Sequence, residues 1–439
     1  MIFWDKIFLK GIKGFPYGSL EIEWPDGISQ KIDALNKGPD AKLKIVDKNV
    51  VKEIIQGGSI KFAELYISKR IITNNLTDLM HYCALNNDQA EETFKINFFR
   101  HFYNKYIHFK NRNTKGQAEK NISHHYDLGN QFYKYWLDKS MTYSSAIFNK
   151  NNDNLELAQN NKYKKLADLS SIKNGDNILE IGCGWGGFSE FLAKNYDCQI
   201  TALTISKEQF QFTTERMKKA NLTSKVTVVF SDYRNIQGKF DKVLSIEMFE
   251  AVGREYWKTF FEKIRTILKP NGNVGLQLIT IDDKIYNVYK NNPDFIQKYI
   301  FPGGMLPSIE VLNNIIENTS FKINSINSYS NDYARTLNIW NKEFNRNWTK
   351  IEKLGFDERF KLLWNYYLSY CEGGFLSKNI DEVTFQALSA KTNITGNEIE
   401  ITFNKQLDTN SSWDFNDFTV SIDGESVTIT NQYINNIDF

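Results

Sequence analysis

A glycine-rich segment is the first part of the chain whose residue types and spacing could perform chemistry. Residues 180–187 read EIGCGWGG, with glycines at Gly182, Gly184 and Gly186. The segment follows an apolar run, DNILEI, and precedes a helical pattern. Its backbone N–H groups would therefore face outward at a helix N-terminus, where a ligand can approach closely. A second reading is a glycine-rich turn that binds no ligand.

The same segment satisfies the GxGxxG spacing of dinucleotide-binding loops through Gly182, Gly184 and Gly187. Two features argue against a nicotinamide cofactor. The second strand ends in LTIS, residues 203–206, without the acidic residue that binds the ribose in that fingerprint. The glycines also stand at every second position, with Glu180 two residues ahead. This ExGxGxG form resembles motif I of class I S-adenosylmethionine-dependent methyltransferases, which leaves a nicotinamide oxidoreductase as a remote alternative.

Histidine is rare, and its positions exclude several kinds of site. The five histidines all lie at or before position 125, so a Ser-His-Asp triad or a His-rich metal site is excluded from the later part of the chain. The four cysteines show no CxxC spacing, and we expect no metal site. A net charge of +2 argues against a generic nucleic-acid partner. The histidines are His81, His101, His108, His124 and His125.

Three zones differ in their patterns and predict the elements that position the loop. Residues 1–115 combine short alternating segments with helical patterns, which predicts a small α+β domain. Residues 116–391 alternate strand and helix signals, typical of βαβ units in a doubly wound, mostly parallel sheet. Residues 392–439 form a β-rich tail with an Asp-Gly hairpin turn, FTVSIDGESVTIT. The predicted fold class is therefore α/β, with a smaller domain before the sheet and a short tail after it.

Several further blocks follow one another along the chain: HYDL (125–128), FY (132–133), TYSS (142–145), LEIGCGWG (179–186), LTISKEQ (203–209), FEAVG (249–253), YIFPGGMLP (299–307), DYARTL (332–337) and YCEGGF (370–375). Their order resembles that found in cyclopropane-fatty-acyl-phospholipid synthases, including the mycolic acid cyclopropane synthases. The resemblance covers roughly residues 120–391, and residues 1–115 resemble, more weakly, the lipid-binding domain of longer family members. It implies the class I methyltransferase fold. The tail resembles bacterial Ig-like repeats, and no role is assigned to it.

The resemblance implies a reaction and the residues that serve it. In the family, a cis double bond of an acyl chain takes the methyl group of S-adenosylmethionine, and a bound bicarbonate ion removes a proton so that a cyclopropane ring closes. The family's glutamate and tyrosine at the anion fall on Glu250 and Tyr333, and its histidine falls on Gln277. Its cysteine falls on Ser145, where the backbone is the main contributor. A glutamine amide can donate a hydrogen bond to an anion but cannot carry charge.

The resemblance also implies the residues that bind S-adenosylmethionine. Tyr143 and Ser144 would lie over the methionine end, and the glycine loop with Glu180 would form the loop of the cofactor site. Residues 204–209 would lie on the ribose side, with Gln209 as a hydroxyl partner, and residues 232–234 would flank the adenine. The implied loop, ribose and adenine residues are Gly182, Gly184, Gly186, Thr204, Gln209, Asp232, Tyr233 and Arg234.

The implied substrate requires contact with a membrane surface. The aromatic-rich segment 94–110 and the basic junction 105–120 could support docking on phospholipid, although a solvated linker is the simpler reading of the junction. We expect a cytoplasmic enzyme, peripheral on the inner face of the membrane, and a homodimer through the N-terminal domain. Gln277 keeps alternatives open: methylation of an olefin without ring closure, methylation of a small-molecule amine, or a non-catalytic lipid-binding relative.

Overall fold

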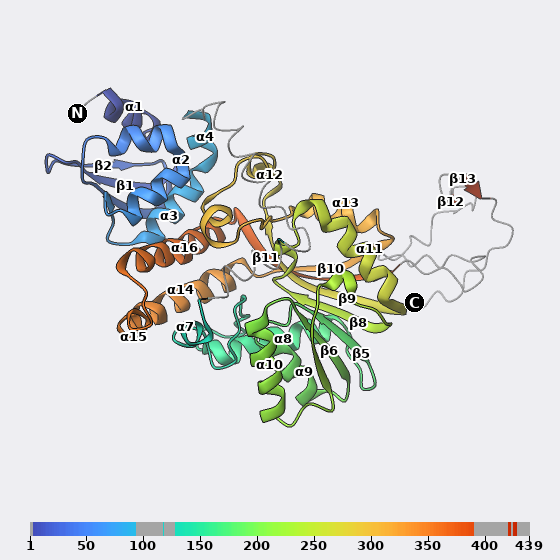
Figure 1. Ribbon diagram of the computed structural model, residues 1–439. Coiled ribbons are helices and arrows are strands. Elements are labelled where there is room, and N and C mark those ends of the chain that lie inside the picture. Colours follow the sequence, from blue (N-terminus) through green and yellow to red (C-terminus); the bar gives the residue numbers. More distant parts are fainter. Residues whose placement is uncertain (1–2, 94–116, 118–127, 390–419, 423–424, 428–439) are drawn as a thin grey trace. The chain divides into compact units, whose positions relative to one another are not determined.

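The computed structural model describes residues 3–93, 117, 128–389, 420–422 and 425–427, shown in colour in Figure 1. The chain divides into two compact units, residues 1–390 and 391–439. In the second unit, β12 (Val420–Ile422) pairs antiparallel with β13 (Glu425–Val427), as the Asp-Gly hairpin predicts. The linker, the aromatic segment 94–110, the predicted 115/116 boundary and four of the five histidines lie outside the described residues.

A seven-stranded sheet forms the centre of the first unit. Its strand order is β10-β11-β9-β8-β5-β6-β7. Strands β9, β8, β5, β6 and β7 run parallel, whereas β11 is antiparallel to both of its neighbours. The predicted doubly wound, mostly parallel sheet is confirmed. The strands are β5 (Asn177–Ile181), β6 (Gln199–Thr204), β7 (Val226–Phe230), β8 (Phe240–Ile246), β9 (Leu268–Ile281), β10 (Phe321–Ser328) and β11 (Ile380–Ser389).

Helices cover both faces of this sheet because each carries one apolar stripe. In α11 (Trp257–Ile267) the buried residues recur three and four positions apart and pack with α13 (Ile309–Glu317) in one core cluster. A second cluster joins the other face to α8 (Leu155–Leu169), α9 (Gly187–Asn195) and α10 (Lys207–Lys219). The carboxyl ends of the parallel strands meet at one edge, where open α/β sheets bind their ligands.

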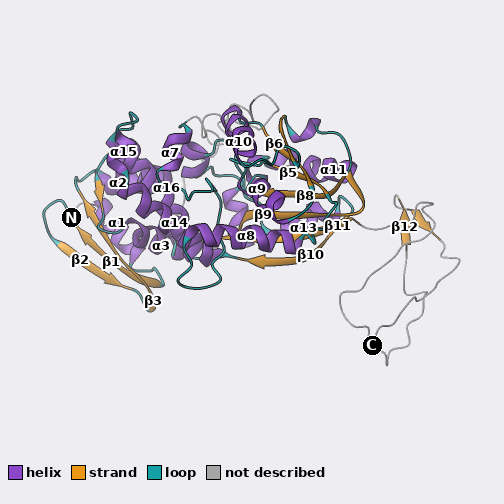
Figure 2. Ribbon diagram, turned by 90° about the horizontal axis from the view of Figure 1, so that it is seen from below, coloured by secondary structure: helices purple, strands orange, loops and turns teal. Residues whose placement is uncertain are grey.

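The N-terminal part of this unit is an α+β module with its own four-stranded sheet, as predicted. The strand order is β2-β1-β3-β4, and Figure 2 shows β1, β2 and β3 side by side. Each described helix of the unit is too short or too polar to span a bilayer. The elements of the module are α1 (Phe3–Ile12), β1 (Tyr17–Glu23), β2 (Ser29–Asp33), β3 (Asn36–Ile45), α2 (Val50–Ile67), β4 (Ile71–Ile72), α3 (Leu76–Leu85) and α4 (Asn87–Thr93).

Helices α14 (Ser330–Arg346) and α16 (Glu358–Leu376) connect the module to the central sheet (Figures 1 and 2). Helix α16 packs against α3 so closely that a Cβ at Gly373 would lie 2.7 Å from the backbone nitrogen of His81. A glycine is therefore required at this contact. The remaining described helices are α7 (Asn130–Lys134), α12 (Asp283–Tyr289) and α15 (Trp348–Glu352), with short turns at Tyr233–Asn235, Phe249–Ala251, Arg254–Tyr256 and Ile296–Ile300.

Candidate active site

The glycine loop lies between β5 and α9, as the sequence pattern predicts. Gly182, Gly184 and Gly186 have φ angles of 83°, 53° and 81°, which glycine adopts without strain. A Cβ at Gly182 would lie 2.7 Å from the Met248 side chain, and one at Gly186 would lie 2.6 Å from Thr213. A Cβ at Gly184 would meet no atom within 4 Å. Two of the three glycines therefore serve packing, and the third leaves open space for a ligand.

That open space belongs to a cavity of about 670 Å³. The cavity begins at the glycine loop, passes the carboxyl ends of β6 and β8, and reaches the apolar interior of the N-terminal module. Gly186 does not line it, and so its role is the tight turn into α9. The predicted cofactor residues that line the cavity are Tyr143, Ser144, Glu180, Gly182, Gly184, Thr204, Gln209, Asp232, Tyr233 and Arg234.

Hydrogen bonds hold the polar residues of the predicted cofactor site in place. The hydroxyl of Thr204 donates to Oε1 of Gln209 at 2.9 Å. The Asp232 carboxylate accepts two hydrogen bonds from the Arg234 guanidinium, at 2.8 and 2.6 Å. Glu180 accepts from the hydroxyl of Ser189, and burial raises the pKa of its carboxyl to about 7. A ligand that enters the cavity therefore meets polar side chains whose positions are already fixed by hydrogen bonds.

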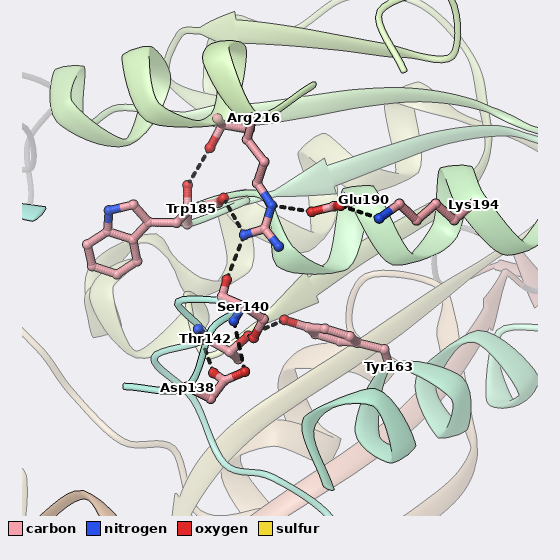
Figure 3. A network of polar contacts seen from close by, with 10 residues as sticks. Asp138, Ser140, Thr142, Tyr163, Trp185, Glu190, Lys194 and Arg216 are labelled. Carbon is pink, nitrogen blue, oxygen red and sulfur yellow. Dashed lines mark hydrogen bonds and ion pairs between the residues drawn. The ribbon is translucent and has the colours of Figure 1, made fainter. Parts of the chain in front are cut away.

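The segment that carries residues 143–145 is fixed to the glycine loop by Arg216 (Figure 3). Nη1 of Arg216 donates to the carbonyl oxygens of Ser140, at 2.6 Å, and Trp185, at 3.1 Å. At the start of the segment, the Asp138 carboxylate accepts from the backbone N–H of Ser140 at 2.9 Å. These contacts hold the segment and the loop against each other before any ligand binds.

Three of the predicted anion-site residues meet around the carboxylate of Glu247, which was not among the predicted site residues. Oε1 of Glu247 accepts from the backbone N–H of Ser145 at 2.6 Å and from Nε2 of Gln277 at 3.3 Å. Its Oε2 accepts from the hydroxyl of Tyr333 at 2.6 Å. Glu247 directly follows β8, at the carboxyl edge of the parallel strands. That position was the signal in the sequence that could have indicated it.

Glu250, the fourth predicted anion-site residue, lies beside this group and binds a different donor. Its Oε1 accepts from the backbone N–H of Ile279 at 2.6 Å, and its buried Oε2 has no hydrogen-bond partner among the described residues. Burial and the charge of Glu247 raise the pKa of Glu250 to about 8. On β11, burial and the charges of both glutamates raise the pKa of Glu382 well above its usual range. Three carboxyl groups thus share one poorly hydrated region.

A buried lysine faces the same region. Nζ of Lys162 donates to the hydroxyl of Ser144 at 2.6 Å. Burial lowers the pKa of this lysine to about 8, and the nearby charges of Glu247 and Asp138 oppose the shift. Lys162 lies four residues from both Ala158 and Leu166 on the buried face of α8. Lys162 was not among the predicted site residues, and the signal for it in the sequence is a lysine at a core position of an amphipathic helix.

Tyr143 lines the cavity, and three aromatic rings of the core pack against it. The ring centroids of Tyr133, Trp136 and Trp340 lie 5.5, 5.3 and 5.4 Å from that of Tyr143. Its hydroxyl lies 2.7 Å from the hydroxyl of Tyr367. Tyr143 and Tyr367 both line the cavity, and aromatic faces at such a position stabilise positive charge, which suits a sulfonium ligand or a cationic intermediate.

The comparison with known families decides the identity of this site. Residues 113–385 match the family model described as mycolic acid cyclopropane synthetase. The chain belongs to this family. Its fold is that of the class I methyltransferases, and the enzyme is an S-adenosylmethionine-dependent methyltransferase. The family resemblance stated from the sequence is therefore confirmed.

Relatives of this cyclopropane synthetase family match most of the chain. The tuberculostearic acid methyltransferase UfaA1 of Mycobacterium tuberculosis is 32% identical over 76% of this chain and 79% of its own length. The cyclopropane-fatty-acyl-phospholipid synthase of Escherichia coli K12 is also 32% identical, over 79% of this chain and 87% of its own. The solved structure of the cyclopropane synthase MmaA2 from Mycobacterium tuberculosis superposes with a TM-score of 0.59 at 28% identity, covering 62% and 98% of the two chains.

The residues present fit the methyl donor that the family uses. Space is open beside Gly184, the hydroxyl of Thr204 is hydrogen-bonded to the amide of Gln209, and the aromatic residues Tyr143 and Tyr367 line the cavity. When bound, S-adenosylmethionine supplies an electrophilic methyl group. The individual roles of the cofactor residues and of Glu250, Gln277, Tyr333 and Ser145 stay predictions.

Proposed function

We propose that this methyltransferase acts on a cis double bond of an unsaturated phospholipid acyl chain and closes a cyclopropane ring there. The observation that carries the proposal is the continuity of the cavity, which joins the glycine loop and the carboxyl groups to an apolar wall. A dry, apolar slot beside the reacting groups is what an acyl chain and a cationic intermediate require.

The apolar wall comes from the N-terminal module. Side chains of α1, the module's sheet and α2 line this part of the cavity. Most of them are nearly inaccessible to solvent, so the wall would remove a hydrocarbon chain from water. The principal residues are Phe8, Ile12, Leu20, Leu43, Ile54 and Phe62.

Methylation of the olefin without ring closure is the second candidate. It is favoured by Gln277, which stands where the family resemblance places a histidine, and one relative is named a tuberculostearic acid methyltransferase. The two candidates share the methyl donor and the acyl chain, and they differ in whether a proton leaves the added methyl group. The fate of that proton therefore separates them. Methylation of a small-molecule amine stays the more distant alternative.

The proposal includes docking of the enzyme on a phospholipid surface at the inner face of the cytoplasmic membrane. Exposed apolar side chains of the N-terminal module support it, among them Phe3, Ile28 and Leu35. We also propose a homodimer through this module, which rests on the family resemblance alone.

Bicarbonate, the base that the resemblance predicts, does not fit the described geometry. The donors that would hold the ion, at Ser145, Gln277 and Tyr333, are bonded to Glu247. A second anion there would also lie against the carboxyl groups of Glu250 and Glu382. We therefore assign no step to bicarbonate.

Mass spectrometry of phospholipid acyl chains from cells that express the enzyme tests the proposal. We expect monounsaturated chains to gain one CH2 unit, with NMR showing the high-field protons of a cyclopropane. Cells that carry the empty vector are the control. A methyl or methylene branch would favour the second candidate, and unchanged acyl chains would reject both.

A further inference from the structure

The carboxylate of Glu247 occupies the centre of a set of anion donors. A backbone N–H, a side-chain amide and a phenolic hydroxyl, from Ser145, Gln277 and Tyr333, all point at its two oxygens. Such convergence of donors is typical of an anion-binding site. Here the anion is a side chain of the protein. We propose that Glu247 is the base that removes the proton during ring closure, in place of a bound ion; this inference rests on the proposed function.

The backbone at Glu247 supports a functional reason for the side chain. Its φ angle is 46°, in the left-handed region that costs energy for residues other than glycine. Its N–H donates to the carbonyl oxygen of Gln277 at 2.8 Å, which holds this conformation. A glycine would take the same conformation without strain. Non-glycine residues in such conformations cluster at functional sites.

The electrostatics favour Glu247 as the ionised member of the three carboxyl groups. Glu247 accepts from three donors, whereas the side chain of Glu250 accepts one bond, from Ile279. The charge of Lys162 also stabilises the anion of Glu247, while burial raises its pKa. Glu250 and Glu382, with raised pKa values of their own, hold their protons more tightly as Glu247 ionises. The result is a single carboxylate of increased basicity in the wall of the cavity.

In the proposed reaction, every bond that forms is matched by a bond that breaks. The π electrons of the double bond form a carbon–carbon bond with the methyl group as its carbon–sulfur bond breaks, which leaves S-adenosylhomocysteine and a carbocation. An oxygen of Glu247 then takes a proton from the new methyl group. The electrons of that C–H bond close the ring on the cation, and Glu247 becomes a neutral carboxylic acid. Release of this proton to water restores the base.

Two changes test the inference: removal of bicarbonate from the buffer, and substitution of Glu247. Both are made with the purified enzyme acting on vesicles of unsaturated phospholipid. In buffer depleted of carbon dioxide we expect the wild-type rate to change less than about twofold.

Glu247→Gln keeps the size of the side chain, and it should lower ring formation about 100-fold or more, as expected for loss of a general base. S-adenosylhomocysteine release should then exceed ring formation, a mismatch that a merely structural defect would not produce. Glu262→Gln, an exposed position on α11, is the matched control.

Glu247→Gly empties the anion position while relieving the strained backbone. This variant should unfold at no lower temperature than the wild type, be inactive without bicarbonate, and regain about tenfold or more in rate when bicarbonate is added. The inference is overturned if the wild type requires bicarbonate, or if Glu247→Gln forms rings at a rate close to that of the wild type. A wild type that methylates no lipid would overturn the proposed function, which the first arm of the experiment detects separately.

Discussion

The hydroxyl of Tyr333 donates a 2.6 Å hydrogen bond to Oε2 of Glu247, while the ring of Tyr333 stacks on Phe375 with centroids 4.4 Å apart. Burial and the charge of Glu247 raise the pKa of this phenol well above its usual range, so it remains a donor. The stacked ring fixes the direction of the hydroxyl. Helix α14 thereby positions a carboxylate that follows a strand more than eighty residues earlier in the sequence.

Tyr333→Phe retains the ring and removes the donor. Without this hydrogen bond the anion of Glu247 is less stabilised, so the pKa of Glu247, already raised by burial, should rise further. Because the base acts when deprotonated, activity falls as pH drops through this pKa, and the acid limb of the kcat/KM profile should move to higher pH. We expect a rate loss of about tenfold at neutral pH. Tyr17→Phe, on the module's surface, should leave the profile unchanged; an unmoved acid limb in Tyr333→Phe would contradict the proposed link.

Glu250 makes the stability of the fold depend on pH in a defined direction. Its pKa is raised from 4.5 to about 8 by burial and by Glu247. Between these values the folded protein holds a proton that the unfolded chain has released, so the free energy of unfolding decreases as pH rises. Glu250→Gln removes this dependence and still offers an oxygen to the N–H of Ile279. Compared by thermal unfolding from pH 5 to pH 8, the variant should lose less stability than the wild type, by a few kcal/mol.

The family resemblance and the geometry of the described site predict different activities for Glu250→Gln. If Glu250 bound a free anion, Glu250→Gln would abolish ring formation. With Glu247 as the base, we expect a smaller loss than in Glu247→Gln, since a neutral amide resembles the protonated carboxyl group of Glu250. Rates of the two variants measured side by side at pH 7 distinguish the two roles.

Gly184→Ala should weaken cofactor binding because its Cβ would enter the cavity. We expect a loss of about tenfold in affinity for S-adenosylmethionine by calorimetric titration, near 1.4 kcal/mol. Gly27→Ala is the matched control: Gly27 also has a positive φ, 82°, with nothing near its Cβ, and it does not line the cavity. Both variants should lose some stability. Equal affinity in the two variants would show that Gly184 does not face the cofactor.

A larger side chain at Ile54 should shorten the space for the acyl chain. Ile54 lines the cavity in the N-terminal module. We expect Ile54→Trp to lower the turnover of long acyl chains more than that of short ones, with little effect on S-adenosylmethionine binding. Ile72→Trp places the same ring at a position of the module that is 45% exposed and serves as the control. Competition between lipids of two chain lengths gives the measurement, and an unchanged preference would argue against an acyl chain in this wall.

Local patterns were sufficient to predict the parallel strands β5 to β9 of the central sheet, but not β10 and β11. The glycines of residues 182–187 and the apolar runs around them predicted a strand, a loop and a helix. Such elements can be predicted because hydrophobic periodicity and glycine positions are properties of a few neighbouring residues. Ser145, Gln277 and Tyr333 are far apart in the sequence, and only the family resemblance predicted that they meet. Spacing alone carries no information on such contacts.

The position of Glu247 directly after β8 could have indicated a site residue, but the pattern does not predict which groups its side chain contacts. Its side chain turns toward Ser145 and Tyr333 because the backbone takes a φ of 46° just after β8. The alternation of side chains between the two faces of a strand does not continue through such a residue. Lys162 is similar: its charge suggests solvent, but the apolar residues around it on α8 place it in the core. Both side chains obtain their partners from distant elements.

A single hydrophobic core extends from Phe8 in α1 through α3 to Trp364 and Phe375 in α16. The apolar wall of the N-terminal module and helix α16, which borders the cavity, are therefore stabilised by the same buried surface. In energetic terms, unfolding of the N-terminal module would expose one face of α16 and open the cavity to water. We therefore expect loss of the apolar wall and entry of water into the cavity to occur together when the module unfolds.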